Sequence, residues 1–295
     1  MTRGTADDHA RADDHALAGG LAAAAGRLLL AVRDEVGFAD ARTLKDTGDL
    51  RSHEHLMAAL AERCPGDAVL SEEGRASVAG KRAAGDDRAP TGNTAAAARL
   101  AAGRVWIVDP LDGTREFAEE GRPDWAVHVA LWTKAGLAAG AVALPAQGRT
   151  LRTSPGGALD VTAGGEAPLR VPEPAPGRLR IAVSRSRPPE FVQRLADALP
   201  LEVELVPIGS AGAKISAVLL GQADAYVHAG GMYEWDSAAP VAVAHAAGAH
   251  ASRVDGSPLE YNRDDPWLPD ILVCHPVSAS TLLTGIRDVT GARPE

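Results

Sequence analysis

The feature that most constrains the fold is an apolar run ending in two acids, in the sequence Trp106–Phe117 (WIVDPLDGTREF). Asp109 and Asp112 stand three residues apart, and the proline between them stiffens the turn. An acid at the end of a buried strand lowers stability unless it has a partner, so the fold has to supply one. A cation suits this place, because Mg²⁺ prefers carboxylates together with substrate phosphate oxygens. A plain acidic turn after a strand is the alternative that this segment leaves open.

Composition narrows the class of protein. The chain has 295 residues, 45% of them hydrophobic, which is enough for one large core or two modest ones. Its formal net charge is -9, and no basic stripe carries interleaved aromatic residues, so we expect no nucleic-acid polymer as partner. Its two cysteines, Cys64 and Cys274, form no CxxC pair, which predicts a reducing, cytoplasmic location. We expect neither a signal peptide nor a membrane-spanning run, and the sequence indicates no particular oligomeric state.

A Pro- and Gly-rich stretch at 164–177 divides the predicted elements into two groups. Before it we expect a helix over 14–36, a loop over 44–50, a helix capped by Asp49 and ending near Arg63, strands over 68–71, 104–108, 126–132 and 137–144, and a loop or partly helical excursion over 77–99. After it, strands over 179–183, 203–207, 223–228 and 271–274 alternate with helices over 190–199, 213–220 and 236–247. The pattern predicts α+β or α/β layers, with an α+β domain at 1–165 and an α/β domain at 166–295.

Acidic residues from both groups stand at the ends of these elements. They are Asp49, Glu72, the pair Asp109 and Asp112, and Asp236. Element ends on a rigid scaffold are where catalytic groups collect. Each acid taken alone can be a cap or a solvated turn, and Asp236 before a helix is an ordinary N-cap. Together they predict a shared metal cluster built from both parts of the chain.

Two segments could bind an anion. Gly209–Lys214 (GSAGAK) lacks the spacing of a P-loop, but it is a small-residue turn before a helix that can accept an oxyanion. Ser184–Arg187 (SRSR) follows a predicted strand and can bind phosphate or ribose hydroxyls. A simple strand-to-helix connection and a solvated loop are the respective alternatives.

With these motifs, the chain resembles the inositol-monophosphatase-like superfamily of lithium-sensitive, magnesium-dependent phosphatases. The segment 106–114 resembles the central DPxDGT motif of that superfamily, 72–73 its upstream acidic pair, and 235–239 its WDxAA motif. The match runs from about residue 44 to residue 274. This resemblance implies an alternating α-β-α-β-α sandwich of the sugar-phosphatase type.

Within the superfamily, the chain is most similar to the bacterial 3'(2'),5'-bisphosphate nucleotidases. These enzymes remove the 3'-phosphate from 3'-phosphoadenosine 5'-phosphate, a by-product of sulfate assimilation. The segments VSRSR, GSAGAK and YEWDSAAP carry the similarity, at 183–187, 209–214 and 233–240. Two alternatives stay open: a phosphatase of the same fold acting on inositol monophosphate or fructose 1,6-bisphosphate, and a non-catalytic metal- or phosphate-binding regulator.

The resemblance also implies roles for single residues around two or three Mg²⁺ ions and a small phosphorylated substrate. The implied metal ligands are Glu72, Asp109, the Leu111 carbonyl, Asp112 and Asp236, with a further, weaker ion at Asp49. The implied catalytic residues are Asp49, Glu72 and Thr114. The implied substrate-binding residues are Asp112, Gly113, Thr114, Ser184, Arg185, Gly209, Ser210, Lys214 and Asp236. The expected chemistry is direct in-line hydrolysis by a metal-activated water, without a phosphoenzyme. The segment 44–49 (LKDTGD) is shorter than the family's usual loop there, which leaves the role of Lys45 open.

Overall fold

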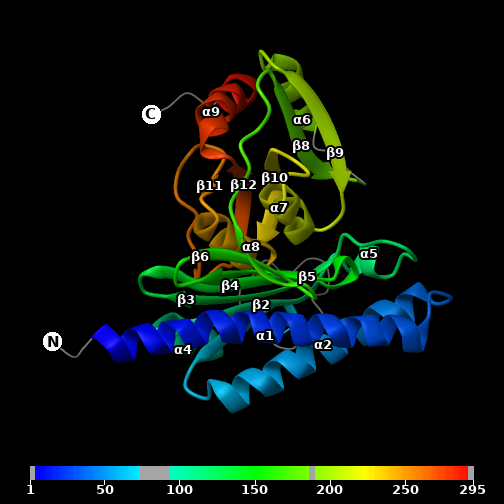
Figure 1. Cartoon of the computed structure of the whole chain (residues 1–295), viewed down its shortest axis with the longest axis vertical. Helices are drawn as coiled ribbons and strands as arrows, with labels where there is room; N and C mark the ends of the chain where they lie inside the picture. The colour runs from blue at the N-terminus through cyan, green and yellow to red at the C-terminus, as the bar shows by residue number, and fades with distance from the viewer. Residues whose placement is uncertain (1–3, 74–93, 186–189, 292–295) are drawn as a thin grey trace.

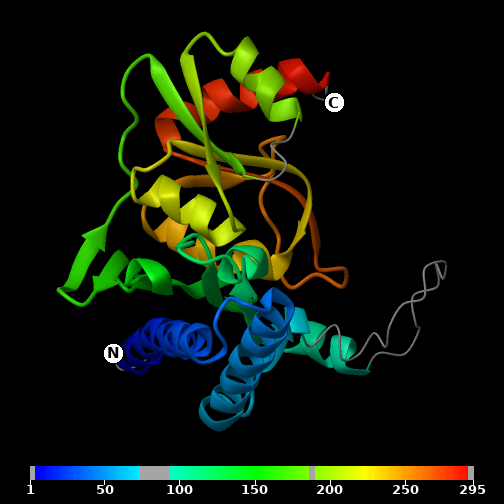
Figure 2. The ribbon, with the colours of Figure 1, turned by 90° about the vertical axis from the view of Figure 1, so that its right-hand side faces the viewer.

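The computed structural model describes residues 4–73, 94–185 and 190–291. These residues form two β-sheets and three layers of helices that alternate from one side of the molecule to the other (Figure 1). The expected α-β-α-β-α layering is therefore confirmed. Figure 2, turned by 90°, shows the second half of the chain on one side of the first sheet and the two long N-terminal helices on the other.

Among the described residues, the first sheet has seven strands in sequence order. They are β1 (Ala68–Ser71), β2 (Arg104–Asp112), β3 (Ala126–Thr133), β4 (Gly136–Leu144), β5 (Arg149–Ser154), β6 (Gly157–Thr162) and β7 (Gly165–Leu169). β1 runs parallel to β2, and the other neighbours are antiparallel. Because parallel strands end at the same edge, Glu72, which directly follows β1, comes to the side of the acids that end β2.

Helices α1 (Gly4–Val36) and α2 (Ala41–Arg63) cover the outer face of this sheet. The helix expected over 14–36 is present and begins earlier in the chain. The loop expected over 44–50 is wrong, because these residues lie inside α2. Its N-cap is Asp40, whose side chain accepts the N–H groups of residues 42 and 43. Asp49 therefore lies inside α2 and does not cap it. Glycine usually destabilises a helix interior, but no larger residue fits at position 48. A Cβ there would stand 2.7 Å from the ring of Phe117.

One segment of α1 is apolar enough to resemble a membrane-spanning helix. Residues Asp14–Val36 are long and apolar enough to cross a membrane by length and composition, although we expected no such run. Half of the most apolar stretch is buried inside the protein, since α1 packs on β3, β4 and β5. This is the environment of a core helix, and such burial accounts for the apolar character without a membrane.

The second half of the chain builds the other sheet and its helices. The strand order among the described residues is β11-β12-β10-β8-β9, with bounds β8 (Arg178–Ser184), β9 (Glu202–Ile208), β10 (Ala225–Tyr233), β11 (His250–Ser252) and β12 (Trp267–Cys274). Helices α7 (Ala211–Leu219) and α8 (Glu234–Ala246) pack against strands of both sheets. Helices α6 (Glu190–Ala198) and α9 (Pro276–Thr290) pack together beyond the second sheet. The strands and helices expected in this half are all present.

The described part of the first half also contains α4 (Thr94–Ala101), α5 (Thr114–Phe117) and the 3₁₀ turn η1 (Pro145–Gln147). Of the excursion expected over 77–99, residues 94–99 lie in α4 and the rest is outside the described residues. One hydrophobic cluster contains Val105 and Leu151 from the first sheet together with Ala239 and Val273 from the second half. The two halves thus share a core, and the division at 165/166 stays a prediction.

Candidate active site

The turn at the end of β2 is held rigidly and carries two buried carboxylates. Its pairing with β3 shifts between Asp109 and Asp112, so the strand is irregular at this point. The Asp109 Oδ1 accepts the N–H of Leu111 at 3.0 Å. The Ser52 hydroxyl of α2 donates to the carbonyl of Pro110 at 2.7 Å. Asp109 is 1% exposed and Asp112 8%, so the two carboxylates lie inside the protein.

Gly113 joins this turn to the second half of the chain. It has a φ of 85°, a left-handed conformation that glycine adopts without steric cost, and it precedes α5. A Cβ at this position would stand 2.7 Å from the Cβ of Ser210. The Thr114 hydroxyl, the next along the chain, donates to the carbonyl of Leu111 at 3.3 Å. Gly113 and Ser210, both predicted to bind substrate, are therefore in close contact.

The carboxylate of Asp112 faces the start of α7. It accepts the N–H of Gly212 at 2.6 Å and that of Ala211 at 3.3 Å, and Ser210 caps the same helix by accepting the N–H of residue 213 at 3.0 Å. The Nε2 of His128 lies 3.2 Å from Asp112 Oδ2. Burial opposes the ionisation of Asp112, but His128 and the Gly212 amide outweigh it and hold the pKa of Asp112 below its usual range.

The other acids of the predicted cluster crowd one another. Desolvation, followed by the charges of Asp236 and Asp49, raises the pKa of Glu72 to about 8, although Glu72 is an exposed residue. Burial, then Glu72, Asp112 and Asp236, raises the pKa of Asp109 well above its usual range. Burial and the charge of Asp112 raise the pKa of Asp236 to about 7. These shifts mean that acids from both halves of the chain share one electrostatic environment.

Asp49 joins the same group from α2. Burial and the charges of Glu73 and Asp46 raise its pKa to about 7, and Lys45 opposes the shift. Lys45 therefore acts on Asp49 through its charge, which gives a first physical role for a residue that the sequence left open. Glu72, Asp109, Asp112 and Asp236 thus act on one another through their charges, and Asp49 is linked to this group through Glu72.

These carboxylates suit a divalent cation by their chemistry and charge. All are hard oxygen donors, and a cation would offset the mutual repulsion that raises the pKa values. Within the described residues, no three Asp, Glu, His or Cys side chains stand together as ligands of one point. Three of the acids accept backbone amides: Asp109 that of Leu111, Asp112 that of Gly212, and Asp236 Oδ2 that of Tyr233 at 2.7 Å. Asp236 is the third residue of α8, so the alternative in which it is a plain N-cap is wrong; Tyr233 holds that position, and the Asp236 side chain accepts its N–H in a capping box.

The predicted phosphate-binding residues lie around the start of α7, with two of their charges already engaged. The guanidinium of Arg185 pairs with Glu116 at 3.2 Å and with Glu119 at 2.8 Å. Lys214 is 5% exposed, donates to the carbonyl of Gly209 and lies over a tyrosine ring, so its ammonium points into the protein. Ser184 ends β8 beside Arg185, whereas residues 186 and 187 of the SRSR segment lie outside the described residues.

Three residues near this site were missed by the sequence reasoning. Asp124 accepts the N–H of Gly209 at 2.7 Å, and a Cβ on Gly209 would stand 2.3 Å from the Cγ of Glu116. His128 is fully buried beside Asp112. For His128 the available signal was a polar residue within the apolar strand AVHVAL. Asp124 lies in an irregular segment and Glu116 in the one-turn helix α5, so no periodic pattern in the sequence marked either of them.

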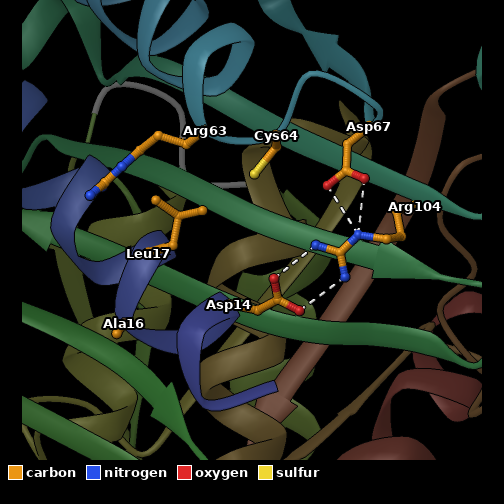
Figure 3. A pocket seen from close by; sticks show the side chains of 7 residues that line it. All are labelled: Asp14, Ala16, Leu17, Arg63, Cys64, Asp67 and Arg104. Atoms are coloured by element: carbon orange, nitrogen blue, oxygen red, sulfur yellow. Dashed lines mark hydrogen bonds and ion pairs between the residues drawn. The ribbon is translucent and has the colours of Figure 1, made fainter. Parts of the chain in front are cut away.

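A separate cavity of about 600 Å³ lies at the other end of β2, beside α1 and the end of α2 (Figure 3). Arg104, the first residue of β2, dominates it and pairs with Asp14 at 2.8 Å and with Asp67 at 3.0 Å. Cys64 lines this cavity, and Cys274 is buried in β12, so both cysteines are free thiols away from the acidic cluster. The charges in this cavity neutralise one another, and the candidate site is the acidic cluster at the far end of β2.

Comparisons with known proteins agree on one family. The model of the inositol monophosphatase family matches residues 16–286. The 3'-phosphoadenosine 5'-phosphate phosphatase of Mycobacterium leprae is 50% identical over 273 residues, 90% of each chain. The 3'(2'),5'-bisphosphate nucleotidase CysQ of Escherichia coli is 33% identical over 56% of this chain and 65% of its own. The solved structure of Mycobacterium tuberculosis SuhB superposes with a TM-score of 0.70 at 25% identity, over 95% of this chain and 97% of its own.

Proposed function

The chain belongs to the inositol monophosphatase family, and from this premise we propose that it removes the 3'-phosphate of 3'-phosphoadenosine 5'-phosphate, giving AMP and phosphate with the help of Mg²⁺. The observation that carries the reaction class is the crowding of Glu72, Asp109, Asp112 and Asp236 beside the Gly113–Thr114 turn. The name of the Mycobacterium leprae relative, with 50% identity over 90% of both chains, supports this substrate over others.

The metal ligands that we propose are the carboxylates of Glu72, Asp109, Asp112 and Asp236 together with the Leu111 carbonyl. Asp49 would hold a further, weaker ion. Bound Mg²⁺ would polarise the phosphate and lower the pKa of an attacking water. As ligands, Asp112 and Asp236 would use the carboxylate lone pairs that the backbone amides leave unoccupied in this structure.

Residues of the β2 turn would orient the reactants. The N–H groups of Gly113 and Thr114 would hold the phosphate, because the left-handed Gly113 leaves its backbone uncovered by a side chain. The Thr114 hydroxyl and the Asp49 carboxylate would accept and orient protons of the water, with Glu72 as a further acceptor. Hydrolysis then breaks the bond between phosphorus and the 3'-oxygen, which takes the proton, while the water oxygen adds to phosphorus. Neither thiol lies in the cluster, which favours direct in-line attack over a phosphoenzyme.

The second phosphate of the substrate would be recognised at the end of β8. Ser184 and Arg185 stand there, and the Nη2 of Arg185 donates to both Glu116 and Glu119, so an anion would compete with these two carboxylates for the guanidinium. Lys214 would contribute from inside the protein: its ammonium donates to the Gly209 carbonyl and adds positive charge near the acids. We place the reaction in the cytoplasm, as a step that clears a by-product of sulfate assimilation.

An inositol monophosphatase activity is the second candidate, favoured by the match of the inositol monophosphatase family model to residues 16–286. The test is a side-by-side measurement of phosphate release with Mg²⁺ from 3'-phosphoadenosine 5'-phosphate, inositol monophosphate and fructose 1,6-bisphosphate. We expect the highest kcat/KM for the nucleotide. An equal or higher value for either sugar phosphate would overturn the proposal, and no release from any ester would indicate a non-catalytic regulator. Asp112→Asn is the matched control, which should fold and lose nearly all turnover.

A further inference from the structure

His128 occupies a position between the two halves of the acidic cluster. It lies on β3, directly opposite Asp109 in the register with β2, and its side chain is fully buried. Its Nε2 is 3.2 Å from the Oδ2 of Asp112. Its Nδ1 is 3.0 Å from the carbonyl of Trp235, the residue directly before Asp236. One imidazole therefore links the last residue of β2 to the first turn of α8.

The two contacts define what each nitrogen does. A carbonyl can only accept, so Nδ1 carries a hydrogen and donates it to Trp235. Nε2 is buried, and within the described part of the chain it has no well-directed hydrogen-bond partner besides its close approach to Asp112. Attraction to Asp112 is thus the interaction that this nitrogen has available.

Gly212 shows that the space around this contact is tightly limited. A Cβ on Gly212 would stand 2.0 Å from His128 Nε2 and 2.9 Å from Asp112 Oδ2. Any larger residue at 212 would have to push the ring or the carboxylate away. The absence of a side chain at this position therefore lets three groups meet at one point: the imidazole, the carboxylate and the N–H of Gly212, which donates to Asp112 at 2.6 Å.

We propose that His128 is a positioning residue for the metal site: it fixes the Asp112 carboxylate relative to α8, so that Asp112 and Asp236 are set to act on the same cation. The inference rests on the proposed function for the nature of the cation. Residues that orient a ligand in this way change metal affinity by about 10- to 100-fold in other proteins. His128 would touch neither substrate nor metal, and its effect would pass through Asp112.

The test compares Mg²⁺ binding in two variants by isothermal titration calorimetry. His128→Leu keeps much of the buried volume but removes both nitrogens, whereas His128→Gln can place an amide nitrogen close to the position of Nε2. We expect H128L to raise the Kd for Mg²⁺ by about 10-fold or more, and H128Q to restore most of the loss. Wild-type affinity in H128L would overturn the proposal, and so would equal weakening in both variants, which would indicate a packing role.

Gly212→Ala provides a second approach that leaves the imidazole in place. Its methyl group would separate His128 from Asp112, so we expect a weakening of Mg²⁺ binding in the direction of H128L, and an unchanged Kd would contradict the inference. His250→Gln is the control, because His250 lies on β11 and contacts a hydroxyl, Ser252 Oγ, at 2.9 Å. Mg²⁺ binding can be measured without substrate. A wild-type protein that binds Mg²⁺ but does not hydrolyse the nucleotide would refute the proposed function, and the comparison of the His128 variants would still be valid.

Discussion

The hydroxyl of Ser52 donates to the carbonyl of Pro110 at 2.7 Å and ties α2 to the turn that carries both carboxylates of β2. Ser52 is fully buried, and Asp49 lies three residues earlier on the same helix, a spacing that places the two on one face. This bond is therefore part of what sets Asp49 against the acids of the first sheet.

Ser52→Ala should lower stability. The substitution leaves the Pro110 carbonyl buried without this donor, so we expect the free energy of unfolding to fall by about 1–3 kcal/mol. Urea denaturation measures the change. Ser154→Ala is the control, since Ser154 also donates to a carbonyl but is only partly buried in the β5–β6 hairpin. A loss in S52A no larger than in S154A would contradict this assignment.

Asp109→Asn should raise the stability of the metal-free protein while lowering its activity. Asn can still accept the Leu111 N–H, and it removes a carboxylate that burial and three neighbouring acids disfavour. We expect a gain of ~1 kcal/mol, or about 2–4 °C in Tm, in the presence of EDTA. Differential scanning calorimetry measures the gain, and phosphate release with Mg²⁺ measures the loss. A lower Tm together with full activity would contradict the view that Asp109 lowers the stability of the protein and is needed for catalysis.

The stability of the metal-free protein should fall as the pH rises. In the folded state the pKa is about 7 for Asp49 and Asp236 and about 8 for Glu72, whereas unfolded acids titrate near about 4. A raised folded pKa favours the protonated acid, so its stabilising effect is complete below about pH 4 and is lost as the pH rises through about 8. We expect Tm in EDTA to fall between about pH 5.5 and 8.5, and saturating Mg²⁺ to reduce that fall. A Tm in EDTA that is constant over this range would contradict the raised pKa values of these acids.

Gly113→Ala should cost more than the same change at another left-handed glycine. Both Gly113 and Gly148 have positive φ, at 85° and 65°, so alanine is strained at either position by about 1–2 kcal/mol. A Cβ at Gly113 would also meet Ser210 at 2.7 Å, whereas a Cβ at Gly148 has nothing within 4 Å. We expect the larger loss in G113A by chemical denaturation. Equal losses would show that the contact with Ser210 adds nothing.

The sequence predicted the layered fold well, because strand and helix periods are local signals. The apolar run before Asp109 and the alternation after residue 177 both appear as elements in the structure. Helix α2 was misplaced because Gly48 and Asp49 resemble a loop, whereas Gly48 stands where the helix packs too closely on Phe117 for a side chain. The polar, irregular strands β5, β6 and β7 gave no clear period and were missed, as were β11 and α9.

In the candidate site too, some residues could be predicted from the sequence and others could not. Asp109, Asp112 and Asp236 were identified from motifs, and the structure places them in one electrostatic environment. The contact between His128 and Asp112 depends on strand register and on a glycine in a third element. The pairing of Arg185 with Glu116 joins residues 69 positions apart. Such contacts follow from tertiary packing and leave no periodic mark in the sequence.

The central claim is that acids from both halves of the chain bind the same Mg²⁺ ions, and Mg²⁺ titration of Asp112→Asn and Asp236→Asn by calorimetry tests it most directly. We expect each single substitution to weaken Mg²⁺ binding strongly. We also expect the double variant to lose less than the sum of the two single losses, because the residues share ligands of one site. Wild-type Mg²⁺ affinity in Asp236→Asn would contradict the claim, because the second half of the chain would then take no part in holding the metal.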